Sequence, residues 1–237
     1  MDLKSFVIEL TGDGSPTLRL KNSTSEKQPE SMHHSGGAAA ETLYIYTEPL
    51  NRVLSVFAQQ DLSIGVVGLG LGYIELSILQ SLPAAKLVSF EKEQELVDSF
   101  KSWINGQENK TYDLICEKLG VDKNLSLKKL KSLDWHLEGE LNPATKISYP
   151  FNYVAYDAFS QFTDGPLWTD EFLDFFLTNL CAKDCVFATY ACTGLLKRAL
   201  IRNNFIFIKR PGFREKRDAT LALRGEFISH LHLFQNA

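Results

Sequence analysis

The distribution of apolar and polar positions divides the chain into short β-type runs and helical segments. Near the start, two β-rich runs within residues 5–21 flank the turn sequence Gly12-Asp13-Gly14-Ser15-Pro16, which predicts an N-terminal β-hairpin. Small and polar residues over 22–40 indicate a loop. This loop leads into a helix predicted over 38–60, which Pro49 should break or kink because proline lacks a backbone N–H donor.

From residue 62 onward the pattern alternates between strands and helices. Residues 62–68 form an apolar β-type run, a glycine-rich turn follows, and residues 73–81 have helical character. Residues 86–90 predict a second strand that ends at Glu91, and a helix follows to about residue 105. A strand–turn–helix–strand unit of this kind opens a parallel α/β sheet.

The second half of the chain continues this alternation after a polar stretch. Residues 106–148 are polar and rich in lysine, with helical stretches near 111–119 and 125–133. The remaining pattern predicts strands at 153–157, 185–190 and 205–209, helices at 169–180 and 194–203, and an antiparallel edge formed by 219–223 and 227–233. We therefore expect an α/β fold in which residues 1–60 form a hairpin and helix packed on the core and residues 61–237 form one structural unit.

Composition and cysteine spacing exclude several classes of protein. The 237-residue chain is 44% hydrophobic and 23% charged, with a formal net charge of −4, as in ordinary globular proteins. No apolar run approaches the roughly 20 residues that cross a bilayer, and the start lacks the features of a signal peptide, so we expect a cytoplasmic protein without a membrane partner. The four cysteines lack the paired spacing of a zinc site, and His33-His34 is interpreted as a pair of loop histidines, so no metal is expected.

The glycine-rich turn reads Gly68-Leu69-Gly70-Leu71-Gly72 and lies between a predicted strand and a predicted helix. Glycines at such a turn let the backbone approach a ligand at the helix N-terminus. Glu91 ends the next strand, where an acid can accept hydrogen bonds from both hydroxyls of an adenosine ribose. A dinucleotide site requires a third glycine where Tyr73 stands, so the pattern favours S-adenosylmethionine (SAM) over NAD or FAD. Many SAM sites have an acid where this chain has Val66, and a glycine turn without a ligand is the alternative.

Asp157 is expected at the carboxyl end of a strand, where an open α/β sheet presents its ligands. Phe159 follows closely, and Trp168 is near in sequence. A carboxylate beside aromatic side chains can orient an amine nucleophile and accept its proton. The alternative is a carboxylate that only caps a helix or holds a loop.

A basic segment covers residues 197–224, where nine lysines and arginines are opposed only by Glu215 and Asp218. A local excess of seven positive charges is typical of a surface that binds a phosphate backbone, although a solvated charged face is the alternative. The residues expected to contact the backbone are Lys209, Arg210, Lys216 and Arg217.

In their order along the chain, several motifs resemble those of the MnmC-like tRNA methyltransferases. They are GDGSPT (12–17), MHHSGGAAAETLY (32–44), GLGLGY (68–73), FEK (90–92), YDAFS (156–160), PLWT (166–169), TYACTG (189–194), KRAL (197–200) and KRPGFREKR (209–217). This family methylates the aminomethyl group of 5-aminomethyl-2-thiouridine at the wobble position of certain tRNAs. The chain departs from the family at Gln161, where proline is usual, and after Gly72, where an asparagine is common.

The resemblance implies a class I SAM-methyltransferase fold, that is, a Rossmann-like sheet with helices on both faces, here preceded by the hairpin. It implies SAM binding by Gly68, Gly70, Gly72 and Glu91, to which Glu41 and Tyr44 of the 32–44 motif are added. It also implies Asp157 as the catalytic acid or base, Phe159 and Trp168 as substrate contacts, and a basic C-terminal segment on the tRNA anticodon loop.

Some members of the family carry a second, FAD-dependent oxidase domain, for which this chain is too short. We therefore expect methyl transfer only, with a separate FAD-dependent oxidase as a possible participant in the same pathway. Two other functions stay open. One is a SAM-fold transferase that acts on a small amine, similar to an aminopropyltransferase, and the other is an RNA-binding module with a degenerate SAM pocket.

Overall fold

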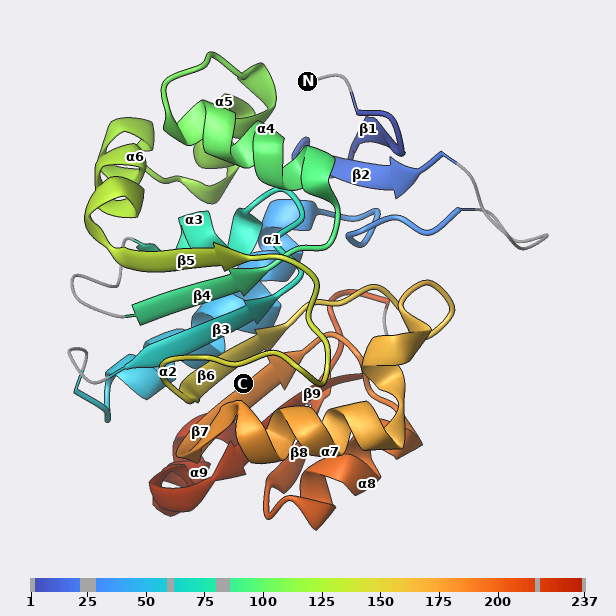
Figure 1. The fold of residues 1–237 in the computed structure, drawn as a ribbon, viewed down its shortest axis with the longest axis vertical. Coiled ribbons are helices and arrows are strands. Elements are labelled where there is room, and N and C mark those ends of the chain that lie inside the picture. Colours follow the sequence, from blue (N-terminus) through green and yellow to red (C-terminus); the bar gives the residue numbers. More distant parts are fainter. Residues whose placement is uncertain (1–2, 22–28, 59–61, 80–85, 216–217, 236–237) are drawn as a thin grey trace.

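A mixed sheet of seven strands forms the centre of the molecule (Figure 1). The computed structural model describes residues 3–21, 29–58, 62–79, 86–215 and 218–235. In spatial order the strands are β5 (Asp134–Glu138), β4 (Lys86–Phe90), β3 (Ser63–Val67), β6 (Phe151–Tyr156), β7 (Cys181–Thr189), β9 (Asp218–Arg224) and β8 (Ile206–Pro211). The neighbouring pairs from β5 to β7 are parallel, and β9 is antiparallel to both of its neighbours.

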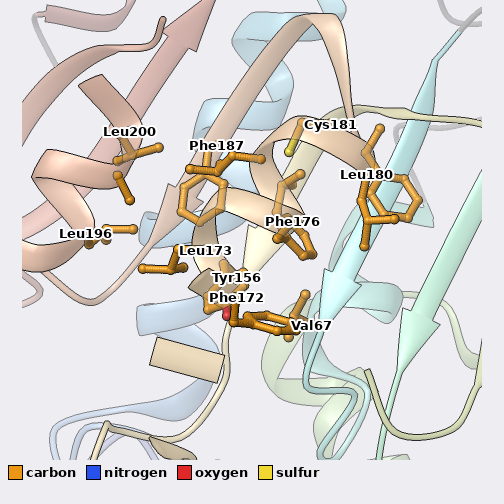
Figure 2. Packing of buried hydrophobic residues seen from close by; sticks show 14 of the residues in the cluster. Val67, Tyr156, Phe172, Leu173, Phe176, Leu180, Cys181, Phe187, Leu196 and Leu200 are labelled. Atoms are coloured by element: carbon orange, nitrogen blue, oxygen red, sulfur yellow. The ribbon is translucent and has the colours of Figure 1, made fainter. Parts of the chain in front are cut away.

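Apolar clusters on the two faces of this sheet follow the alternation of side chains along each strand. Ile64 and Val66 of β3 pack on one face, together with the helical segment η1–α2 and with α3. Val67 packs on the other face. Figure 2 shows this second cluster, in which α7 and α8 bring Phe172, Phe176 and Leu196 against the sheet. The expected α/β arrangement with helices on both faces is confirmed.

The helices connect the strands in the expected alternation. Their bounds are α1 (Ala38–Thr42), the π-helical η1 (Leu43–Thr47), α2 (Glu48–Leu54), α3 (Tyr73–Leu79), α4 (Gln94–Ile104), α5 (Lys110–Leu119), α6 (Lys123–Ser132), the 3₁₀-helical η3 (Gly165–Trp168), α7 (Asp170–Asn179) and α8 (Gly194–Arg202). No helix within the described ranges is long and apolar enough to cross a membrane. Thr169 caps α7 as expected, its side chain accepting the N–H of Phe172.

The N-terminal hairpin is confirmed as a separate two-stranded sheet of β1 (Phe6–Leu10) and β2 (Pro16–Leu20). The helix expected over 38–60 is shorter and ends at Leu54. The chain then turns so that Phe57 packs against Phe227, with ring centroids 5.5 Å apart. Pro49 lies in the first turn of α2, directly after η1, so it accompanies a change of helix type without ending the helical segment.

Two further expectations about secondary structure were wrong. Strand β5 was not predicted, because it is an edge strand whose residues alternate between exposed and half-buried positions and form no apolar run. Residues 227–233 were expected to be a strand, but they belong to the 3₁₀ helix η4 (Gly225–His230) and to α9 (Leu231–Gln235). Phe227 and Phe234 are both buried on the sheet, and their spacing of seven residues corresponds to two helical turns.

Candidate active site

A cleft of about 290 Å³ opens where β3, β4 and β6 end. The chain runs outward from β3 to β4 and β5 and then returns to β6 on the other side of β3, so this is the point where the strand order reverses. Open α/β sheets bind their ligands at such points. The cleft is lined by residues that follow the three strands, by residues 30–33 and by parts of the loop between β6 and η3.

The glycine turn after β3 forms the floor of the cleft. Gly68, Gly70 and Gly72 have φ values of 91°, 53° and 71°, a region that side chains disfavour. A Cβ atom on Gly68 would lie 2.7 Å from the carbonyl oxygen of Asp157, and one on Gly72 would lie 2.5 Å from the ring of Phe100. Gly68 and Gly70 line the cleft, whereas Gly72 allows α3 to pack closely against α4.

Glu91 lies at the end of β4, lines the cleft and is only 9% exposed. Its Oε2 accepts the N–H of Gly70 and its Oε1 accepts the N–H of Glu93, both at 2.9 Å. Burial raises the pKa of Glu91, while these two backbone donors act in the opposite direction. The carboxylate is therefore oriented before any ligand binds, and its remaining lone pairs can accept hydroxyl donors.

Asp157 follows β6 on the opposite side of the glycine turn and also lines the cleft. Its N–H donates to the carbonyl of Val67 at 2.8 Å, which extends the pairing of β6 with β3. Its Oδ1 accepts a hydrogen bond from the hydroxyl of Tyr46 at 2.5 Å. The sheet thus brings Asp157, Glu91 and the glycine turn together, as the sequence predicted.

The cleft carries an excess of acidic groups. Among the described residues that line it, the carboxylates belong to Glu30, Glu91, Glu93, Glu140, Asp157 and Asp164. Lys92 is the only lysine or arginine among the same lining residues, and it forms an ion pair with Asp164. A low-dielectric cleft lined by one sign of charge concentrates ligands of the opposite sign. This cleft therefore suits cationic groups and amines.

Residues 30–33 were treated as part of a loop, but they form one wall of the cleft. Glu30 accepts the N–H of Ser160 at 3.0 Å and also the hydroxyls of Ser160 and Thr163. The sulfur of Met32 lies against Gly70, and the ring of His33 meets that of Tyr73 at 4.9 Å. Met32 and His33 open the 32–44 motif, which was the available signal for this wall.

Three expected ligand contacts lie behind the cleft, and none of them is among its lining residues. Glu41 is buried and accepts the N–H of His34 at 2.6 Å. The Tyr44 hydroxyl donates to the carbonyl of Pro211 at 3.0 Å. The Trp168 indole N–H donates to the carbonyl of Phe159 at 2.6 Å. Phe159 itself lines the cleft, so Trp168 supports it from behind.

The basic segment is largely paired within the protein. Arg210 is 4% exposed and forms an ion pair with Glu48 at 2.9 Å, which does not fit the expected contact with a phosphate backbone. Lys209 pairs with Asp218 at 2.9 Å. Arg202 pairs with two acids of α7, and Arg224 donates to backbone carbonyls. The exposed cations among the described residues of the segment are Lys197, Arg198, Arg202, Lys209 and Arg214, whereas Lys216 and Arg217 lie outside the described residues.

Comparisons with known proteins agree with this geometry. Residues 110–225 match the family described as S-adenosyl-L-methionine-dependent methyltransferase. No curated protein matches the chain. A solved structure of MNMC2 from Aquifex aeolicus is similar with a TM-score of 0.65 and 20% identity, over 93% of this chain and 71% of that chain. DesVI from Streptomyces venezuelae is similar with a TM-score of 0.51 and 10% identity, over 79% and 92% of the two chains.

The residues of the cleft fit SAM as the cofactor. The turn at Gly68 and Gly70 has no Cβ atoms on the cleft floor, and Glu91 presents an oriented carboxylate beside it. Both features lie at the switch point of a sheet with the topology expected for class I methyltransferases. The expected class I methyltransferase fold is thus confirmed, and residues 110–225 match the family of S-adenosyl-L-methionine-dependent methyltransferases.

Proposed function

We propose that this enzyme methylates the primary amine of the aminomethyl group of 5-aminomethyl-2-thiouridine at the wobble position of tRNA. The assignment of an amine as the methyl acceptor rests on the position of Asp157 beside the glycine turn in an acidic cleft. The motifs that resemble the MnmC-like enzymes, together with the similarity to MNMC2, support the tRNA substrate.

Gly68, Gly70 and Glu91 would hold SAM, with Glu91 accepting from the ribose hydroxyls. When bound, SAM would supply an electrophilic methyl group for the lone pair of the amine nitrogen. The fixed positions of the turn and of Asp157 on adjacent strands would align the two reactants, and such alignment lowers the barrier substantially.

Asp157 would orient the amine and accept the proton that its nitrogen loses. Proton transfer by a positioned group typically contributes about 10²–10⁴-fold to a rate. The acceptor nucleoside lies in a single-stranded loop, so moving it into a cleft requires little unstacking energy. Phe159, at the cleft wall, offers a face for the base.

Contacts with the rest of the tRNA would come from the exposed residues around the cleft. Phe162 is 91% exposed, and it lies in the loop whose residues Phe159 and Thr163 line the cleft. Arg214 lies against Gly36, next to the wall formed by residues 30–33. Aromatic side chains can stack on unpaired bases, and exposed cations can bind phosphates.

A specific observation favours a second candidate, a SAM-fold transferase that acts on a small amine. The cleft is acidic, and Arg202, Arg210 and Arg224 of the basic segment already have partners within the protein. A polyamine would suit this cleft without needing any basic surface.

The two candidates are separated by offering both acceptors to the enzyme. The purified protein is incubated with methyl-labelled SAM and either total tRNA carrying the aminomethyl nucleoside or a set of small polyamines, with Asp157→Asn as the control for catalysis. We expect label in tRNA, recovered by mass spectrometry as a methylated wobble nucleoside. Label in polyamines and none in tRNA would overturn the proposal in favour of methyl transfer to a small amine.

A further inference from the structure

Tyr46 lies beneath the cleft, in the short π-helical segment η1 between α1 and α2. π-Helical turns are rare, and they occur frequently at functional sites because they shift the direction of nearby side chains. Tyr46 is 2% exposed and packs in the apolar cluster that also contains β3 and β6 residues. Its hydroxyl reaches Asp157, which lines the cleft.

Strand β6 and the residue after it hold Tyr46 at two points. The hydroxyl of Tyr153 in β6 donates to the backbone carbonyl of Tyr46 at 2.6 Å. The hydroxyl of Tyr46 donates to Oδ1 of Asp157 at 2.5 Å. This second distance is within the range of strong bonds from a hydroxyl to a carboxylate. The backbone and the side chain of Tyr46 are therefore both tied to the strand that carries Asp157.

We propose that Tyr46 is a positioning residue that fixes the Asp157 carboxylate for an amine acceptor, an inference that rests on the proposed function. In this arrangement Oδ1 receives the Tyr46 hydroxyl, and Oδ2 contacts the amine and takes its proton. The bond restricts rotation of the carboxylate and stabilises its ionised form, which is the form that accepts a proton.

The surroundings of Tyr46 keep it a hydrogen-bond donor. Burial raises the pKa of Tyr46 well above its ordinary value, and the charge of Asp157 and the hydrogen bond to it act in the same direction. Tyr190 and Glu41 also interact electrostatically with Tyr46 and raise its pKa. The pKa of Tyr190 is itself raised by burial and by nearby acidic groups that include Glu30 and Asp164. The change Tyr46→Phe removes one hydroxyl and leaves all of these other titratable side chains in the protein.

The first test needs no acceptor substrate. Carboxyl carbons of aspartate are labelled with ¹³C, and the Asp157 resonance is assigned by its loss in Asp157→Asn. Tyr46→Phe should move the midpoint of the Asp157 titration to higher pH by roughly one unit, because the carboxylate loses a donor that favours its charged form. An unchanged midpoint would overturn the proposal.

The second test measures methyl transfer to tRNA at saturating SAM. Tyr46→Phe should lower kcat roughly 10- to 100-fold, the range for a lost hydrogen bond to a charged group. KM for tRNA and Kd for SAM should change less than about threefold, and the acidic limb of the pH–rate profile should move to higher pH. A purely structural role would instead lower the melting temperature and weaken SAM binding, and that result would contradict the proposal.

Two controls complete the design. Tyr112→Phe removes a hydroxyl from another buried tyrosine, which packs against Phe100 and Trp103 outside the cleft, and it should leave kcat unchanged. Adding Tyr46→Phe to Asp157→Asn should cause no further loss, whereas a full additional loss would refute coupling through Asp157. If the wild-type enzyme transfers no methyl group to tRNA, the proposed function fails, and the titration still decides the role of Tyr46.

Discussion

Replacing Glu75 with glutamine should remove much of the pH dependence of stability between about pH 4.5 and 7. Glu75 follows the glycine turn on α3 and is fully buried. Its Oε1 accepts the hydroxyl of Ser89 at 2.6 Å, and that hydroxyl oxygen accepts the indole N–H of Trp135 at 3.1 Å. Burial raises the pKa of Glu75 from 4.5 to about 7, and the hydrogen bond from Ser89 opposes this shift.

The sign and the size of the effect follow from this shift. Between pH 4.5 and 7 the folded state holds a proton on Glu75 that the unfolded state has lost, so stability falls as pH rises through this window. A difference of about 2.5 pH units between the two states corresponds to about 3 kcal/mol. Glutamine has the shape of the neutral acid and does not ionise. The stability of Glu75→Gln relative to the wild type should therefore increase only as pH rises.

Urea unfolding followed by tryptophan fluorescence at pH 5, 6, 7 and 8 gives the free energy of unfolding for each protein. The variant should equal or fall slightly below the wild type at pH 5, and should exceed it by about 2–3 kcal/mol at pH 8. Glu117→Gln, an exposed change on α5, should leave the two pH profiles parallel. A constant difference between Glu75→Gln and wild type at all four pH values would refute the reasoning.

Other predictions concern the ligands and the basic segment. Glu91→Ala should weaken SAM binding by roughly 1–3 kcal/mol in calorimetry, because a pre-oriented charged acceptor is lost, and NADH should not bind to either protein; equal SAM affinity would exclude Glu91 from the site. Replacing Lys197 and Arg198 together with glutamine should weaken tRNA binding and reduce its salt slope by roughly 0.7–0.9 per charge, as measured by filter binding at several salt concentrations; an unchanged slope would place tRNA elsewhere. Arg210→Met should instead lower the free energy of unfolding by about 1–3 kcal/mol, because the buried Arg210 loses its ion pair with Glu48, and it should change tRNA affinity little; a variant of unchanged stability with impaired tRNA binding would contradict this assignment.

The sequence predicted the part of the site that depends on spacing along adjacent strands. Gly68 and Glu91 stand at the ends of consecutive strands, and Asp157 ends the strand on the other side, so their meeting follows from the parallel sheet alone. The exposure of the basic residues could not be predicted from spacing along the chain. Arg210 belongs to a local charge cluster, but Glu48, which is 162 positions away, removes it from the surface. Tertiary packing alone decides that Arg210 is buried while Arg198, in the same basic segment, is exposed.

The secondary structure likewise divides into elements that the sequence pattern predicts and elements that depend on tertiary contacts. Apolar runs predicted the central strands, because these are buried on both faces and need no partner to be recognised. Edge strand β5 lacks this signal, since it is held by its pairing with β4 and by little burial of its own. The wall formed by residues 30–33 has no regular sequence pattern, because its position depends on backbone pairing with β2 and on the contacts of Glu30 with Ser160 and Thr163.

The hydrogen bonds that continue the sheet beyond its strands have a mechanical consequence for the enzyme. Gly68 donates to the carbonyl of Phe90, Asp157 donates to that of Val67, and Glu91 donates to that of Glu138. The glycine turn, Glu91 and Asp157 are thus held by one continuous hydrogen-bonded sheet and not by three separate loops. Under the proposed function, this shared frame would keep the glycine turn, Glu91 and Asp157 in fixed relative positions. The size of the acceptor would be set by the wall at residues 30–33, which lies outside the seven-stranded sheet.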